Sequence, residues 1–227
     1  MYVVLEEIAS LKEKVGSLVN ARLGQFRELG KKGEVIFDFR PFANYVYQID
    51  IFSELCFCIL TANSSALMGI KLQESIGVEG FKSMSFEQLE KAIASLGHRF
   101  PKQRAERIVK ARERFEGVLE LLRSEKESKK IRELLSDPKS PYKVEGLGLK
   151  EASHFLRNIG FENLAIVDRH VLRYLKEKSL VPESKTLTKN LYIQAEERLE
   201  ELCHRLGISQ AELDLYIFYE KTGKVLK

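Results

Sequence analysis

Apolar residues recur three and four positions apart along almost the whole chain, which is the spacing of one face of an α-helix. Near the N-terminus this pattern predicts two helices, one through residues 5–15 and a second from residue 19 to Gly30, where the glycine ends it. Residues 34–40 (EVIFDFR) alternate instead and are rich in β-branched and aromatic side chains. They predict a strand or an extended arm.

The middle of the chain contains its most apolar helix. Residues 49–60 (IDIFSELCFCIL) are apolar on nearly every side, as expected of a helix buried inside a helical core. Gly77 and Gly80 then interrupt the pattern, and Ser85 with Gln88 forms a capping-box sequence that starts the next helix. Helices are expected over residues 86–96, 103–123, 131–135, 152–160, 169–176, 188–206 and 209–222. The fold class predicted from the pattern is all-α.

Composition narrows the class of protein only slightly. The 227 residues are 44% hydrophobic and 31% charged, which is typical of a globular chain and not of a disordered or collagen-like one. No apolar run approaches the roughly 18 residues of a membrane span, and the N-terminus lacks the basic-then-apolar order of a signal peptide. We therefore expect a cytoplasmic protein that has no membrane partner.

Cysteine usage and charge distribution add two further points. Cys56, Cys58 and Cys203 are too few for a four-cysteine zinc or iron–sulfur site, so we expect them to be small buried hydrophobes. Residues 99–132 carry twelve Lys or Arg against six Asp or Glu, although the whole chain has a net charge of only +4. This stretch is either an electrostatic footprint for a polyanion or a solvated helix face with charge pairs four residues apart.

Residues 142–174 contain the features that say most about function. Gly146 and Gly148 flank Leu147 in a predicted tight turn that leads directly into a helix. Unpaired backbone N–H groups at such a helix N-terminus can face a phosphate, and glycines let the backbone approach it closely. The turn is not a dinucleotide-binding fingerprint, because the third glycine and the preceding strand are missing.

These residues resemble the helix-hairpin-helix DNA glycosylase superfamily, specifically its 8-oxoguanine DNA glycosylase/AP lyase branch of archaea and some thermophilic bacteria. The matching segments are 60–66 (LTANSSA), 97–100 (GHRF), 146–150 (GLGLK), 152–158 (ASHFLRN), 168–170 (DRH) and the end of the chain from residue 213. The resemblance implies two helical subdomains flanking a DNA-binding cleft. Residues 1–45 and 172–227 would form the terminal subdomain, and residues 46–171 the central one, with the helix-hairpin-helix at about 131–160.

In this family a hairpin lysine and an aspartate eighteen residues later mark the members that also cut the strand, which implies that Lys150 is the nucleophile and Asp168 its partner. A neutral lysine amine can attack the sugar and form a Schiff base, from which β-elimination breaks the strand. An ionised carboxylate stabilises the positive charge that develops on the sugar. Both residues also have simpler interpretations: Asp168 is well placed to cap the next helix, and Lys150 could be one more phosphate contact.

The resemblance assigns further roles. An enzyme that acts on a base in duplex DNA must flip it out and fill the gap. The DNA and substrate residues implied are Asn63 in the gap, Arg99 and Phe100 near the opposite base, Gly146 and Gly148 in the hairpin, His170 on a phosphate, Phe218 as a stacking wall in place of an expected tryptophan, and Lys227 through its terminal carboxylate. The backbone carbonyls of Tyr142, Val144 and Leu147 would hold a monovalent cation.

The sequence therefore predicts a base-excision repair enzyme that excises 8-oxoguanine from double-stranded DNA and cleaves the abasic site. We expect it to act as a monomer and without a cofactor. Two alternatives remain open at this point. One is a glycosylase for another damaged base, and the other is a helix-hairpin-helix module that binds DNA without catalysis.

Overall fold

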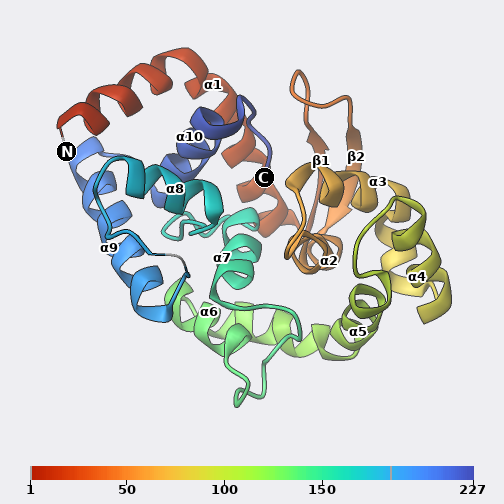
Figure 1. The fold of residues 1–227 in the computed structure, drawn as a ribbon. Helices are drawn as coiled ribbons and strands as arrows, with labels where there is room; N and C mark the ends of the chain where they lie inside the picture. Colours follow the sequence, from red (N-terminus) through yellow and green to blue (C-terminus); the bar gives the residue numbers. More distant parts are fainter. Residues whose placement is uncertain (1, 185) are drawn as a thin grey trace.

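The computed structural model describes residues 2–184 and 186–227 and is mostly helical within them, as predicted (Figure 1). The elements are α1 (Tyr2–Lys32), β1 (Glu34–Asp38), β2 (Val46–Asp50), α2 (Ile51–Thr61), α3 (Ala66–Ser83), α4 (Phe86–Ser95), α5 (Pro101–Ser124), α6 (Ser128–Ser136), α7 (Leu149–Asn158), α8 (Arg169–Glu177), α9 (Lys189–Leu206) and α10 (Gln210–Thr222). No helix in this part of the chain is both long enough and apolar enough to span a membrane.

One long helix, α1, replaces the two N-terminal helices expected from the pattern, so that prediction is wrong. Gly30 does not end a helix but lies inside α1. A Cβ atom at this position would lie 2.0 Å from the carbonyl oxygen of Ile159, which follows α7. The glycine therefore permits a close approach between α1 and the end of α7, and this requirement comes from tertiary packing.

The segment predicted to be extended is strand β1, and it pairs with a strand that the pattern did not indicate. β1 and β2 form an antiparallel hairpin in which Val35 is opposite Ile49. Strand β2 ends at Asp50, whose side chain accepts from the Ser53 N–H and completes a capping box for α2. The expected buried helix thus begins two residues later than predicted.

Helix α2 is the centre of the core, as predicted. Every residue from Phe52 to Thr61 is buried, and α2 packs against α3, α5 and α7. Cys56 and Cys58 on this helix and Cys203 on α9 are free and buried, as expected. Gly77 has φ 69° and kinks α3, and the Ser85–Gln88 capping box is present at the start of α4.

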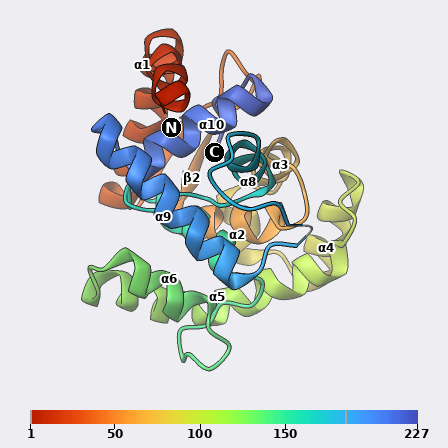
Figure 2. The ribbon, with the colours of Figure 1, turned by 60° about the vertical axis from the view of Figure 1, so that its left-hand side comes forward.

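The helices form two groups on either side of α7. Figure 1 shows α1, α8, α9 and α10 on one side and α2 to α5 on the other, and in Figure 2 α9 again runs beside α1 and α10. The chain returns at its C-terminus to the region between these groups. The subdomain boundaries at residues 45 and 171 stay a prediction, and the β1–β2 hairpin crosses the first of them.

Only some of the basic residues at positions 99–132 are exposed. Arg104 is buried and donates to the Ala62 carbonyl, while Arg132 is buried and paired with Glu196. Lys110 forms an exposed pair with Glu106 four residues away. Arg104 and Arg132 therefore stabilise the packing of the chain, whereas Lys110 stays on the surface.

Candidate active site

A cavity of about 1120 Å³ opens between the two groups of helices, at the upper end of volumes typical of ligand sites. Six Lys or Arg and three Asp or Glu residues line it. It brings together seven of the predicted site residues: Asn63, Arg99, Lys150, Asp168, His170, Phe218 and Lys227. Phe100, Gly146, Gly148 and the carbonyl-bearing Tyr142, Val144 and Leu147 are not among the residues that line it.

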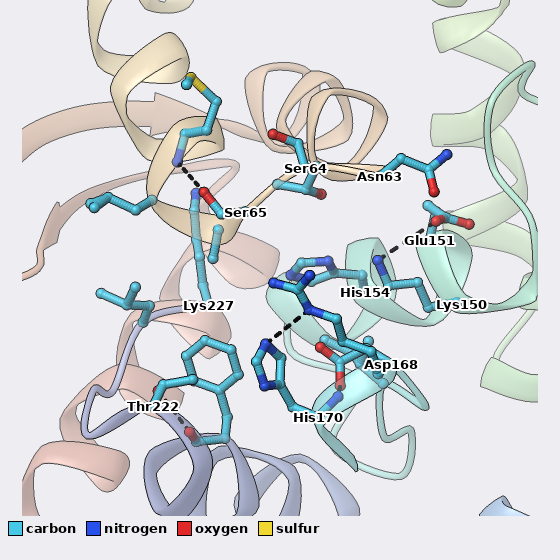
Figure 3. Close-up of a pocket in the computed structure, with 18 of the residues that line it drawn as sticks. Asn63, Ser64, Ser65, Lys150, Glu151, His154, Asp168, His170, Thr222 and Lys227 are labelled. Carbon is cyan, nitrogen blue, oxygen red and sulfur yellow. Dashed lines mark hydrogen bonds and ion pairs between the residues drawn. The ribbon is translucent and has the colours of Figure 1, made fainter. Parts of the chain in front are cut away.

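Lys150 lies in the first turn of α7, directly after the predicted turn. Gly146 has φ +96°, a conformation that favours glycine, and this turn sets the direction in which α7 begins. The Lys150 side chain is 27% exposed and its Nζ lies 3.6 Å from Glu151 Oε1. Figure 3 shows both side chains on the Asp168 side of the cavity. Lys150 is thus accessible, with one carboxylate nearby.

The N-terminus of α7 is capped from within the chain. The Gly148 N–H donates to Glu151 Oε2 at 3.2 Å, in a capping-box arrangement. The expectation that this N–H group is unpaired is therefore wrong. The cause is local, because a glutamate at the third helical position reaches back to the cap residue.

Asp168 caps α8, which confirms the simpler of its two interpretations. Its Oδ1 accepts from the His170 N–H at 2.8 Å and from the Val171 N–H at 2.9 Å. Both bonds use the same oxygen, and Oδ2 accepts no hydrogen bond from the residues described. The side chain lines the cavity, so capping leaves one oxygen for a second role.

His170 and Phe218 form an aromatic pair in the cavity wall. Their rings meet edge to face with centroids 5.5 Å apart, and Arg169 Nε donates to His170 Nε2 at 3.3 Å. Burial lowers the pKa of His170; the charge of Asp168 opposes this shift, and the nearby Arg169 and Arg173 add to it. The net shift favours the uncharged imidazole.

Two residues of α7 that the sequence reasoning missed share the face of Lys150. His154 and Arg157 follow it at four and seven positions, so helical spacing from the lysine was the available signal. Both are buried and line the cavity. Neither ring nitrogen of His154 has a hydrogen-bond partner among the described residues, and the same holds for Arg157 Nε and Nη1. Burial lowers the pKa of His154 well below its usual value.

Asp214 on α10 is a buried carboxyl group in the cavity wall. It lies 3.5 Å from Arg157 Nη2. Burial raises the pKa of Asp214 to about 7; Arg157 opposes this shift, whereas the charge of Asp168 adds to it. The Arg157–Asp214 pair joins α7 to α10 beneath the start of α8.

Lys227 ends the chain inside the core. Its Nζ donates to Glu54 Oε2 and to Gln73 Oε1, each at 2.6 Å, and lies 4.0 Å from the centre of the Phe57 ring. Burial lowers the pKa of Lys227 to about 8, although Glu54 pulls it upward. The side chain is 0% exposed, so the part of Lys227 that lines the cavity is its main chain.

The turn after α2 is held by residues from the loop before α5. Asn63 is exposed and has φ 59°, which is uncommon for a residue other than glycine. Arg99 donates to the Asn63 carbonyl at 3.0 Å, and His98 Nε2 lies 3.0 Å from the Leu60 carbonyl. The exposed Phe100 lies beside Arg99, with the guanidinium 5.5 Å from its ring centre. Asn63, Arg99 and Phe100 therefore lie together in one exposed cluster.

Two of the three carbonyls predicted to hold a cation, those of Val144 and Leu147, accept hydrogen bonds within the chain, and no donor to Tyr142 O is found among the described residues. Leu147 O accepts from the ammonium of Lys143, and Val144 O accepts from the Leu147 N–H at 3.2 Å. Lys143 also donates to the carbonyl of Ser136, at 2.9 Å. A lysine ammonium thus uses one of the three carbonyls that the resemblance assigns to a cation.

Comparison with known proteins gives a consistent set of matches. The family model described as 8-oxoguanine DNA glycosylase matches residues 32–208. The chain is 55% identical to an 8-oxoguanine DNA glycosylase/AP lyase of Aquifex aeolicus, over 98% of this chain and 99% of that protein. Its structure is similar to the crystal structure of the 8-oxoguanine DNA glycosylase of Thermotoga maritima, with a TM-score of 0.84, 38% identity and full coverage of both chains. It is also similar to the Methanocaldococcus jannaschii 8-oxoguanine glycosylase/lyase in complex with 15mer DNA containing 8-oxoguanine, with a TM-score of 0.83, 37% identity and coverage of 99% and 100%.

Proposed function

We infer the function of this chain from its family, because the chain belongs to the 8-oxoguanine DNA glycosylase family. We propose that it excises 8-oxoguanine from double-stranded DNA and then cleaves the abasic site. The observation that carries this proposal is that Lys150 and Asp168 line the same cavity. Asp168 caps α8 with Oδ1 alone, so its Oδ2 is not used in capping. One chain supplies every residue of the site, so we propose that it acts as a monomer.

In the proposed reaction Lys150 is the nucleophile. Its neutral amine attacks C1′ of the damaged nucleotide, so an N–C bond forms as the bond from C1′ to the base breaks and the base leaves with a proton. Opening of the sugar gives a protonated imine. Loss of a proton from C2′ then expels the 3′ phosphate, and water releases the lysine. These steps need no cofactor.

Asp168 is proposed to act through the oxygen that does not cap α8. A carboxylate there stabilises the positive charge on the sugar as the base departs. It can also accept the proton that the attacking amine loses. Capping by Oδ1 fixes the orientation of the carboxylate before the substrate arrives, so the two interpretations of Asp168 are complementary.

The rim and the wall of the cavity suit a flipped base. We propose that Asn63 fills the gap in the duplex while Arg99 and Phe100 contact the opposite base, since the three form one exposed unit. The extruded purine would stack on Phe218 and bond to the terminal carboxylate of Lys227. The unpartnered nitrogens of His154 and Arg157 offer donors for its oxo groups.

The test is cleavage of a duplex with one 8-oxoguanine, with and without borohydride. Wild type should nick this strand and leave an undamaged duplex intact, and borohydride should trap a covalent protein–DNA adduct. Lys150→Gln should give no adduct and no nick, whereas the exposed control Lys102→Gln should behave as wild type. Normal trapping by Lys150→Gln would refute the assignment of the nucleophile. Binding without scission by wild type would favour a non-catalytic DNA-binding module, and activity only on other lesions would change the substrate.

A further inference from the structure

The hairpin between α6 and α7 encloses one ammonium group among main-chain carbonyls. Lys143 Nζ donates to Ser136 O, at the last residue of α6, and to Leu147 O, just before α7. The side chain is half-buried. One cation therefore ties the two ends of the hairpin together.

The carbonyl set of this hairpin does not fit an additional metal ion in this arrangement. Leu147 O accepts from Lys143, and Val144 O accepts from the Leu147 N–H. A monovalent ion bound to Leu147 O would lie next to the ammonium of Lys143. Two positive charges that share one carbonyl oxygen repel each other strongly. Hence a metal ion held by the carbonyls of Tyr142, Val144 and Leu147 would have to share Leu147 O with the ammonium of Lys143.

A second cation covers the turn from outside. A Cβ atom at Gly146 would lie 2.8 Å from Arg107 Cδ, so the arginine side chain crosses the turn closely. Lys110, one helical turn further along α5, pairs with Glu145 at 3.0 Å. The turn is thus braced by basic side chains of α5 in addition to Lys143.

We propose that the ammonium of Lys143 is the built-in cation of the hairpin, so that the chain needs no monovalent metal ion there to hold the turn for DNA. An ammonium group has the charge of K⁺, and its three N–H donors suit carbonyl oxygens. This inference rests on the proposed function only in that its readout is DNA binding. Lys143 acts here as a positioning residue, because it fixes the main chain that leads into Lys150.

The experiment measures affinity for a duplex with a tetrahydrofuran abasic analogue, which the enzyme cannot cleave. Fluorescence anisotropy is recorded in potassium, sodium or tetramethylammonium chloride at equal ionic strength, since tetramethylammonium is too large to enter the carbonyl set. The affinity of wild type should agree within about twofold among the three salts. Lys143→Gln should bind at least about fivefold more weakly in tetramethylammonium than in potassium, because its freed carbonyls recruit K⁺.

Two further variants make the result specific. Lys139→Gln, an exposed lysine of the same loop, and Lys143→Arg, which keeps the positive charge, should both be indifferent to the salt. A fivefold loss by wild type in tetramethylammonium would overturn the proposal, and so would salt-independent binding by folded Lys143→Gln. Should Lys143→Gln fail to fold, the wild-type and Lys143→Arg comparison decides alone. Failure of the proposed function has a different signature, since wild type would then leave 8-oxoguanine uncleaved in every salt.

Discussion

Lys150 and Lys227 line the same cavity, and their surroundings differ in almost every respect. Lys150 is 27% exposed and has Glu151 at 3.6 Å, whereas the Lys227 side chain is 0% exposed and paired with Glu54 at 2.6 Å. Figure 3 shows them on opposite sides of the cavity. A side chain that must react is left accessible and loosely partnered, while one that shapes the site is tied into the core. We expect substitutions at the Lys150 side to change activity and those at the Lys227 side to change stability.

The largest expected effect tests the Lys150 side through Asp168. Asp168→Asn should slow base excision by about 10²- to 10⁴-fold, because the charge that faces the sugar is lost. The amide oxygen still caps α8, so the melting temperature and DNA affinity should stay near those of wild type. Single-turnover excision and a melting curve measure the two properties.

Asp168→Ala is the matched control. It removes the cap as well as the charge and should cost a further ~1 kcal/mol of stability. If Asp168→Asn unfolds as readily as Asp168→Ala while its folded fraction excises at the wild-type rate, Asp168 is a capping residue only.

The next effect tests the Lys227 side. Lys227→Met removes the ion-pair partner of the buried Glu54, which typically costs about 3 kcal/mol or more. For a chain of this size that corresponds to a fall of roughly 6–12 °C in melting temperature. Lys224→Met is the control, because Lys224 lines the same cavity but is less buried. The double variant Glu54→Gln/Lys227→Met should recover part of the loss. An unchanged melting temperature in Lys227→Met would show that the buried ion pair contributes nothing to stability.

The pH dependence of stability tests a third residue of the cavity wall, Asp214. The folded-state pKa of Asp214, about 7, is above the ordinary value of 3.8, so the folded protein binds more protons than the unfolded chain between these values. The stability that Asp214 contributes is therefore fully present below pH ~4 and is lost as the pH rises through about 7, with a slope of up to ~1.4 kcal/mol per pH unit.

Urea unfolding between pH 5 and 8 tests this expectation. Asp214→Asn should lack this part of the slope, and the exposed Asp137→Asn should keep it. Parallel stability curves for wild type and Asp214→Asn would mean that Asp214 titrates alike in both states.

The sequence predicted what local rules determine. Helical spacing located most helices, and cap residues such as Ser85 marked where they begin. The resemblance pointed to Lys150 and Asp168, which line one cavity, and their catalytic roles stay predictions. The parts that failed depend on distant partners. Gly30 resembles a helix end until Ile159 is placed against it, and Glu54 is separated from Lys227 by 173 residues.

Strand β2 was missed for a related reason. It is a short segment, and it forms because β1 offers a pairing edge. The partner of Glu54 could have been anticipated in part. Glu54 lies in the most apolar helix of the chain, and a buried carboxylate requires a cation or hydrogen-bond donors nearby.

The smallest expected effect concerns Phe218, which lines the cavity with both lysines and meets His170 edge to face. Phe218→Trp offers a larger face for stacking, and aromatic pairs are worth ~0.5–1.5 kcal/mol. The ratio of excision rates for 8-oxoguanine over guanine should therefore rise roughly twofold to tenfold, and Phe218→Leu should lower it. Single-turnover rates at equal temperature measure the ratio, with melting curves to confirm that both variants keep the fold. Equal ratios in all three proteins would make Phe218 a packing residue of α10, and substrate selection would then rest with the main chain of Lys227 and the polar face of α7.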